Sequence, residues 1–455
     1  MTPAPEELVE QLLPVVAERG TYAGERRRYF DGEHRQLVEI SKQRRVTAAL
    51  LEVVKLRDNL MPGVIRALTS RLHIEGWTGE WQDEIEAITA RNRFGLLQKE
   101  LHQEAPLGGD SAVVVWPGAD GRARFYPVKA GSFAVMYDPV DLTRLVAAMR
   151  VWSEKRAGRP YVCATIYTDR ELIDLVTRQP AEKLPHRPDA WRVEEVRPNP
   201  YGVNPFHHLP NDADLGTMGR SELDPAIPLQ DQLNLTLVNS QIAEEDVAWR
   251  QLVRIGAEVI IDPATGEVVP PKTGPGSVMD VGHGGDVKTL GGQDLSPFLD
   301  KQEAIRREIA AVTGTPLHML SLMTGTPPSG EALDVLEKAL TDRARDRQQE
   351  WTWPWSAAMA LALYIDGVRV DGAEGAAGVR AIAVKPTWSP PESTSELKRV
   401  ELVETKIRAG WPPVAAFMEA GYSEDEARQL VADRAAFDEE QSARRAIDFD
   451  AGLVA

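Results

Sequence analysis

Residues 282–289 (GHGGDVKT) come nearest in this sequence to a phosphate-binding loop. A nucleotide loop of the type GxxxxGK[ST] needs glycine directly before the lysine, so that the backbone can curl round a phosphate. Val287 stands at that position, and a β-branched residue resists the positive φ of such turns. The two TGTP turns, which begin at Thr313 and Thr324, offer no better cradle because proline has no N–H to donate. We therefore expect a surface turn and two helix ends rather than a nucleotide site.

Carboxylate, histidine and thiol groups are present, but their spacing does not suit catalysis. Residues 244–246 (EED) are consecutive in a helical pattern, so their side chains point about 100° apart and cannot converge on one metal ion. Asp212 and Asp214 lie in a Pro/Gly/Asn-rich stretch without the rigid pocket that an acid–base pair needs. The eight histidines form no cluster with ligand spacing, and the single cysteine, Cys163, is expected to be a buried thiol. The sequence predicts no catalytic residues, no metal and no cofactor.

Composition limits the classes of function further. The chain has 455 residues with 43% hydrophobic and 27% charged residues, which is typical of globular proteins, and its length suggests several folding units. The net charge of −17 disfavours tight binding of duplex DNA, since affinity for phosphates comes mainly from Lys and Arg. The acidic amphipathic start has no signal-peptide pattern, and the longest apolar run is too short to span a bilayer. We expect a protein that stays inside the cell and has no membrane span.

The hydrophobic period divides the first half of the chain. Residues 5–101 have mostly helical spacing, whereas residues 109–197 alternate with period two in short runs, which predicts a mostly antiparallel β unit. Residues 199–224 are rich in Pro, Gly and Asn and are predicted to be an extended linker. Residues 225–256 then predict a helix of about seven turns. Its apolar stripe is Leu229, Leu233 and Leu237, and its opposite, polar side is Gln230, Asn234, Gln241 and Glu245.

The second half alternates between short strands and long helices. Residues 257–269 have a hairpin signature, residues 278–281 are strand-like, and residues 295–312 predict a second helix that ends at the first TGTP. Residues 331–365 predict one long helix, bent at Pro354 because proline removes a backbone donor, with Trp351, Trp353 and Trp355 in core or interface packing. Residues 368–372 and 379–388 are predicted strands, and residues 393–455 are predicted to be helical and acidic.

Several segments in this order resemble the portal, or head-to-tail connector, proteins of long-tailed bacteriophages. They are RYFDGEH (28–34), GRSELDPAIPLQDQLN (219–234), TGTPLHML (313–320), PPSGEAL (327–333), WSPPESTSE (388–396) and GYSEDEA (421–427). The resemblance implies an α+β portal-type fold with a helical stem, a small β clip, a mixed α/β wing and a helical C-terminal crown. It divides the chain into a wing (1–224), stem helix one (225–256), a clip (257–294), stem helix two (295–317), a tunnel loop (318–330), the bent helix with wing strands (331–392) and a crown (393–455).

The resemblance also implies a function. Such proteins form a ring, usually of twelve subunits, at one vertex of the capsid, and double-stranded DNA is packaged and ejected through its channel without sequence specificity. The implied partners are the terminase packaging motor, the major capsid protein and a head-to-tail adaptor, with no membrane. The implied location is the virion, and the host cytoplasm during assembly. The small-residue turns would then be the mobile link between the stem and the long helix.

The resemblance assigns candidate channel residues to two groups. The tunnel loop would present His318, Ser321, Met323, Thr324, Gly325, Thr326, Ser329 and Gly330 to DNA. The stem would present Lys301, Arg306, Arg307, Gln241 and Glu245. The three basic residues could form sparse cationic rings in an otherwise acidic lumen.

Two other hypotheses remain open on the sequence alone. The first is a non-catalytic oligomeric scaffold or adaptor that binds other proteins through its acidic helical C-terminus. The second is an uncharacterised cytoplasmic enzyme that uses the carboxylates of residues 199–224, which would require a deep pocket with converging polar groups.

Overall fold

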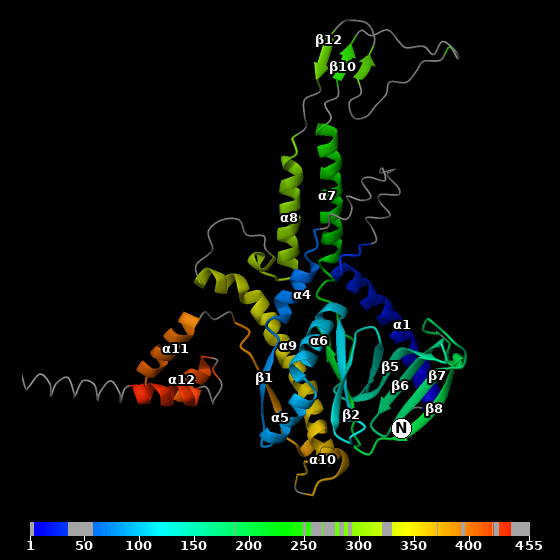
Figure 1. The fold of residues 1–455 in the computed structure, drawn as a ribbon, viewed down its shortest axis with the longest axis vertical. Coiled ribbons are helices and arrows are strands. Elements are labelled where there is room, and N and C mark those ends of the chain that lie inside the picture. The colour runs from blue at the N-terminus through cyan, green and yellow to red at the C-terminus, as the bar shows by residue number, and fades with distance from the viewer. Residues whose placement is uncertain are drawn as a thin grey trace, which may run out of the picture.

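The computed structural model of the chain shows a body of helices and sheets from which a pair of helices projects (Figure 1). It describes residues 4–34, 58–185, 187–248, 252–255, 266, 278–281, 286–289, 294–320, 330–370, 372–392, 396–420, 422 and 427–437. The sheets of the body are antiparallel and have helices packed on them, so the predicted α+β class is confirmed. The boundaries of wing, stem, clip and crown stay a prediction.

The largest sheet of the body is antiparallel and has helix α1 (Pro5–Phe30) packed on it. Its strands follow chain order: β4 (Phe133–Tyr137), β5 (Leu145–Arg156), β6 (Arg159–Thr168), β7 (Glu171–Thr177) and β8 (Trp191–Pro198). The short 3-10 helix η1 (Pro188–Ala190) precedes β8. Leu8, Leu12 and Val16, at helical spacing on α1, are buried against Met149 and Ile166 of the sheet. The antiparallel β unit predicted from the period of two is confirmed, and Cys163 is buried in β6 as expected.

A second sheet has strand order β3 (Ala123–Val128), β2 (Asp110–Pro117), β9 (Phe206–Pro210). Because successive side chains of a strand point to opposite faces, β2 divides its residues between two cores. Ala112 and Val114 pack toward the large sheet, whereas Val113 and Val115 pack in the core shared with α6 (Phe94–Gly108) and α9 (Gly330–Ile365). Strand β9 lies inside residues 199–224, so the prediction of an extended linker there was wrong.

A small two-stranded sheet completes the body. Strand β1 (Ile74–Thr78), between α4 (Met61–Thr69) and α5 (Gln82–Arg91), pairs antiparallel with β13 (Lys385–Trp388). The start of the chain, predicted to be mostly helical, contains this strand between its described helices. The predicted strand at 368–372 is wrong for the residues described, and 379–388 holds the end of α10 (Gly375–Ala381) as well as β13.

The projecting pair consists of α7 (Ile227–Ala248) and α8 (Ser296–Val312), which lie side by side in Figure 1. Beyond their far ends, β10 (Leu252–Ile255) pairs parallel with β11 (Val278–Val281) and antiparallel with β12 (Asp286–Thr289). The predicted helix 225–256 is thus too long, because its last apolar residues form strand β10. Apart from residue 266, the predicted hairpin at 257–269 lies outside the described residues.

Helix α9 is continuous through Pro354, and the bend predicted there stays a prediction. Trp351 and Trp355 are fully buried, as expected, while Trp353 is 70% exposed. The C-terminal region is helical in α11 (Glu396–Arg408), α12 (Pro413–Glu419) and residues 427–437. No helix among the described residues is long and apolar enough to cross a membrane.

Candidate channel helices and the polar mount at their base

The two projecting helices are joined through one apolar stripe each. Leu233 of α7 and Ile305 and Ile309 of α8 are buried in one cluster, with Leu229 and Leu237 packed at its margin. This confirms the stripe predicted from the i, i+4, i+8 spacing of the leucines. The short 3-10 helix η2 (Leu317–Leu320) follows α8 and adds Leu320 to the same cluster.

The side of α7 predicted to be polar is partly buried, which corrects the prediction. Gln230 and Asn234 are almost completely inaccessible. The Gln230 amide accepts a hydrogen bond from the backbone N–H of Leu60 at 3.0 Å and donates one to the Asp58 carbonyl at 2.5 Å. Asn234 Nδ2 lies 2.7 Å from His34 Nδ1. Buried amides require such partners, so the first turns of α7 are fixed by directional bonds to other elements.

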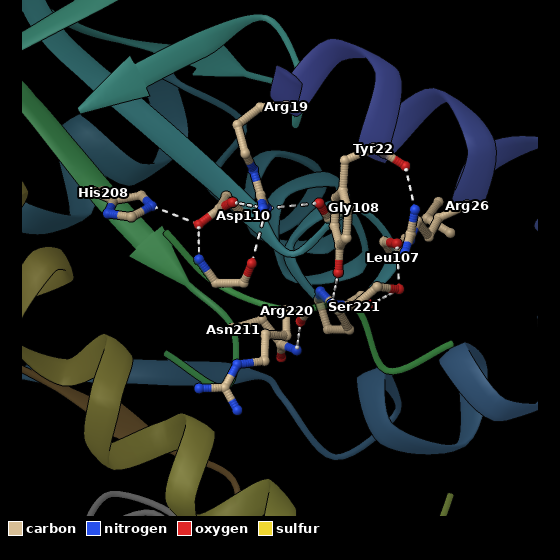
Figure 2. A network of polar contacts seen from close by, with 12 residues as sticks. Arg19, Tyr22, Arg26, Leu107, Gly108, Asp110, His208, Asn211, Arg220 and Ser221 are labelled. Atoms are coloured by element: carbon tan, nitrogen blue, oxygen red, sulfur yellow. Dashed lines mark hydrogen bonds and ion pairs between the residues drawn. The ribbon is translucent and has the colours of Figure 1, made fainter. Parts of the chain in front are cut away.

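The segment that leads into α7, residues 211–224, is held by a network centred on Asp110 at the start of β2 (Figure 2). The Asp110 carboxylate is fully buried and is ion-paired with Arg19 of α1. It also accepts a hydrogen bond from Gly219 N at 2.7 Å and lies 2.8 Å from His208 Nε2. The Tyr137 hydroxyl lies 2.8 Å from the other ring nitrogen of His208, which completes a chain of polar contacts across both sheets. We call residues 211–224 the mount.

A second set of bonds ties the mount to α1 and α6. The hydroxyl of Tyr22 donates to Asp224 at 2.5 Å and accepts from Ser221 N at 2.8 Å, and Arg26 Nε donates to the other oxygen of Asp224 at 2.8 Å. The Ser221 hydroxyl donates to the Leu107 carbonyl at 2.7 Å. Burial and the bond to Asp224 raise the pKa of Tyr22 to about 12, so this hydroxyl keeps its proton at neutral pH.

Helix α9 binds the mount through two arginines. Arg347 donates to Asn211 at 2.8 Å and pairs with Asp212 and Glu222 at 3.2 Å each, and Arg343 pairs with the other oxygen of Glu222. Burial lowers the pKa of Arg343 to about 10, which leaves it charged at neutral pH.

Glu350 adds one more carboxylate to this contact. It lies 3.4 Å from Arg347 Nη1 and accepts a hydrogen bond from the backbone of Ala213. Burial, followed by the nearby charges of Asp212 and Asp110, raises the pKa of Glu350 to about 7, although Arg347 opposes the shift. Three carboxylates thus meet two guanidinium groups, with Asp212 at the exposed margin and the others largely buried. Protonation of Glu350 would balance the charges, and the raised pKa brings this protonation close to neutral pH.

Glycine allows the closest approach within the mount. A Cβ atom on Gly219 would lie 2.1 Å from the Gly109 carbonyl oxygen and 2.5 Å from the backbone N and O of Asn211. Gly109 itself has φ +91°, in the left-handed region that favours glycine. Sequence reasoning missed this site, because its members lie far apart in the chain. The only visible signal was the pair of glycines beside charged residues, Gly109-Asp110 and Gly219-Arg220.

A family model described as "Phage portal protein, SPP1 Gp6-like" matches residues 68–411, which include the three sheets described for the body and helices α7, α8 and α9. The chain belongs to this family of phage portal proteins. Its function is therefore that of a portal, or connector, and the family is a structural one. The resemblance inferred from the ordered segments of the sequence is confirmed.

Solved structures similar to this portal chain include three components of gene transfer agent particles. The neck of a native particle with C12 symmetry is 14% identical, with 80% of this chain and 90% of that chain covered and a TM-score of 0.42. A chain of the native virion is 17% identical, with 84% and 92% covered and a TM-score of 0.39. The neck of an empty particle with C6 symmetry is 17% identical, with 85% and 93% covered and a TM-score of 0.42. No curated protein sequence matches the chain.

The predicted stem residues of this portal protein differ in their surroundings. Lys301 and Arg307 are exposed on α8, and Arg307 pairs with Glu303 one turn away. Arg306 is half-buried and pairs with Asp58 at 2.6 Å, so it ties α8 to the chain before α4 and is not a free cation. Gln241 is half-buried, and the side chain of Glu245 lies outside the described residues. The assignment of these residues to a channel stays a prediction.

The predicted tunnel loop, residues 318–330, is described only at its two ends. His318 lies in η2, with Nε2 3.0 Å from Glu337 Oε1 of α9, and the other oxygen of Glu337 accepts from Arg71 at 2.7 Å. Gly330 is the first residue of α9. Both residues therefore belong to helical ends and not to an open loop. Ser321, Met323, Thr324, Gly325, Thr326 and Ser329 lie outside the described residues.

Proposed function

We propose that this portal protein assembles into a closed ring whose central channel conducts double-stranded DNA into and out of a capsid. The observation that carries the proposal is the helix pair α7 and α8. In a chain of the portal family, the pair projects from the body with a small sheet beyond its far end (Figure 1). Copies standing side by side about one axis would enclose a channel bounded by these helices. Ring closure needs only one repeated contact between neighbouring subunits.

The proposal includes the place and the partners of the ring. It would contain twelve subunits and occupy one vertex of the capsid in the virion, after assembly in the host cytoplasm. A terminase motor would dock to it and supply the ATP hydrolysis, since the portal itself is proposed to be non-catalytic. The major capsid protein would surround it, and a head-to-tail adaptor would replace the motor after packaging.

The charge of the chain suits a conduit better than a DNA-binding surface. With a net charge of −17, each subunit repels a polyanion as a whole. Lys301 and Arg307, which are exposed on α8, would provide a few transient contacts with the DNA backbone. A channel with few basic residues would pass DNA without holding it. Affinity for DNA grows with the number of phosphates that Lys and Arg neutralise, and here that number would be small.

Mass measurement and negative-stain imaging of the purified full chain test the proposal. The expected result is a closed ring with a central hole and a mass that is a multiple of the 50.2 kDa subunit. A monomer that persists under all conditions of concentration and salt would contradict it. Removal of residues 393–455 distinguishes a portal from an adaptor. A portal is expected to keep its ring through stem and body, whereas an adaptor that binds through its C-terminus would lose its partner.

The proposed movement of the link between the helix pair and α9 has its own test. Replacement of Gly325 and of Gly330, the first residue of α9, by valine is expected to impair DNA packaging more than ring assembly, because the backbone of the link and not core packing would be restricted. Packaging assays on particles and mass measurement of the rings provide the two readouts. Equal loss of both would show that these glycines serve folding and not movement.

A further inference from the structure

Two exposed apolar surfaces of the body have opposite charge around them. The first surrounds Leu96, which is 66% exposed on the outer side of α6. Arg93 and Lys99 are exposed three residues before and after it, so they lie on the same side of the helix. Lys129, next to β3, pairs with Glu100 at 3.1 Å, so this surface carries three cations and one carboxylate. We call Leu96 with these basic residues the knob.

The second surface is formed by two neighbouring turns. Val140 is 94% exposed in the turn between β4 and β5, and Leu215 is 64% exposed at the tip of the turn at 214–217. The turns are packed together, because a Cβ atom on Gly216 would lie 3.0 Å from a methyl group of Leu142. Trp353 lies one turn of α9 beyond Glu350, which is bonded to Ala213, and it is 70% exposed. We call Val140, Leu142, Leu215 and Trp353 the patch.

The turns that form the patch are ordered by their own aspartates, which also make the patch acidic. Asp138 accepts from Val140 N at 2.9 Å, Asp141 accepts from Thr143 N at 3.1 Å, and the carbonyl of Asp214 accepts from the Thr217 hydroxyl at 2.8 Å. The carboxylates of these turns are Asp138, Asp141, Asp212 and Asp214. Asp138 pairs with Arg144, Asp212 with Arg347 and Asp214 with Arg220. The four carboxylates outnumber these three arginines, so the patch keeps a small excess of negative charge, opposite to that of the knob.

The knob and the patch lie at opposite edges of one sheet. In the order β3-β2-β9, strand β3 leads to Lys129 of the knob, whereas β9 leads to residues 212–217 of the patch. The contact between Tyr137 and His208 brings the start of the β4–β5 turn to the β9 side as well. A ring needs an interface in which two different surfaces of each subunit meet head to tail, and the knob and the patch are two such different surfaces.

On these grounds we propose, given the ring of the proposed function, that the knob of each subunit docks on the patch of the next subunit. Leu96 would cover the apolar surface formed by Leu215 and Trp353, while the knob cations face the carboxylates of the patch. An exposed tryptophan among apolar residues with a charged margin is the arrangement found at the energetic centre of protein interfaces. The complementary charges would select the head-to-tail register and exclude contact between two patches.

Cross-linking of paired cysteines tests the contact directly. The variant Leu96→Cys/Leu215→Cys is treated as an assembled ring with a short bifunctional maleimide, and the only native cysteine, Cys163, is 2% exposed. The expected result on a denaturing gel is a ladder of dimers, trimers and larger species, whereas each single variant stays monomeric. Rings of normal mass without a ladder would overturn the proposal and leave the proposed function intact. Dimers from a single variant would overturn it too, because they would show contact between like surfaces.

Charge reversal provides a second test that does not depend on cross-linking. Lys99→Glu and Asp214→Lys each change an exposed side chain and are each expected to raise the protein concentration for half-assembly roughly fivefold. The combined variant is expected to recover part of the loss. A combined variant no better than the weaker single variant would overturn the pairing. Failure of the unaltered chain to form any ring would overturn both the proposed function and this contact.

Discussion

Glu350 makes the contact between α9 and the mount sensitive to pH, and Glu350→Gln tests this. Its pKa is raised from 4.5 to about 7, which corresponds to about 3 kcal/mol of stability. The side chain is 23% exposed, so solvent screening reduces the expected effect to about 2 kcal/mol. In the folded protein the group holds its proton longer than in the unfolded chain. Its contribution is therefore fully present below pH 4.5 and is lost as the pH rises to about 7.

Glutamine cannot ionise, and it keeps an oxygen that can accept from the backbone of Ala213. The variant is therefore expected to match the unaltered protein at pH 4 and to be more stable by about 2 kcal/mol at pH 8. Urea unfolding at both pH values, followed by tryptophan fluorescence, to which the buried Trp351 and Trp355 of the same helix contribute, measures the difference. Asp214→Asn, at a carboxylate that is 80% exposed in the mount, is the matched control and is expected to change stability by about 0.5 kcal/mol at most. A change of equal size at both pH values, or a loss of stability at pH 8, would refute the reasoning.

Three further substitutions address the packing around the stem. Gly219→Ala is expected to abolish the native mount, because the new Cβ would lie 2.1 Å from the Gly109 carbonyl oxygen. A lower yield of soluble protein and a lower melting temperature are the expected readouts. Asp110→Asn is expected to destabilise the fold by about 3 kcal/mol in urea unfolding, since Arg19 would be left without its buried partner. Gly63→Val is expected to cost about 2 kcal/mol, because a Cβ at this position of α4 already approaches Leu320 of η2 to 2.7 Å.

Two glycines in open positions serve as controls for these substitutions. A Cβ on Gly24 of α1 or on Gly95 of α6 would meet no atom within 4 Å. Gly24→Ala and Gly95→Ala are therefore expected to leave stability unchanged or to raise it by about 0.5–1 kcal/mol, since alanine is the better helix former. If Gly63→Val or Gly219→Ala behaved like these controls, the close contacts described for η2 and the mount would be wrong. For Asp110, a loss below about 1 kcal/mol would show that the ion pair with Arg19 is dispensable.

Local patterns in the sequence predicted the elements that depend on local rules. The stripe of Leu229, Leu233 and Leu237 identified α7, and the alternation of residues 109–197 identified the antiparallel sheet. The end of α7 was misplaced because the apolar residues of β10 continue a helical spacing, and periodicity alone does not separate a short strand from the last turn of a helix. Gln230 and Asn234 were assigned to a hydrated side for a similar reason. A polar residue is usually exposed, and the partners that bury these two come from distant parts of the chain.

The mount is the clearest case in which composition alone predicted the wrong structure. Residues 199–224 have the composition of a linker, yet Asn211 and Ser221 are buried and β9 pairs with β2. The bonds that order this segment join residues about one hundred positions apart, such as Asp110 with Gly219 and with His208. Turn-forming residues such as glycine adopt backbone angles that other residues avoid. The same composition therefore occurs in flexible loops and, as in the mount, in segments whose backbones approach each other closely. Only the tertiary fold distinguishes the two uses.

The mount relies on directional bonds where an apolar contact would have sufficed for stability alone. Burial of apolar surface is non-directional, so it holds two elements together without fixing the angle between them. Hydrogen bonds and ion pairs at Asp110, Asp224 and Glu222 each require a particular geometry, and together they join the start of α7 to α1, α6 and α9. In a closed ring every subunit repeats the same angle, and a small error in each copy would add up around the circle. In the proposed ring, helices fixed by buried polar contacts would meet that demand, and the charged residues at the base of the projecting helices would serve it.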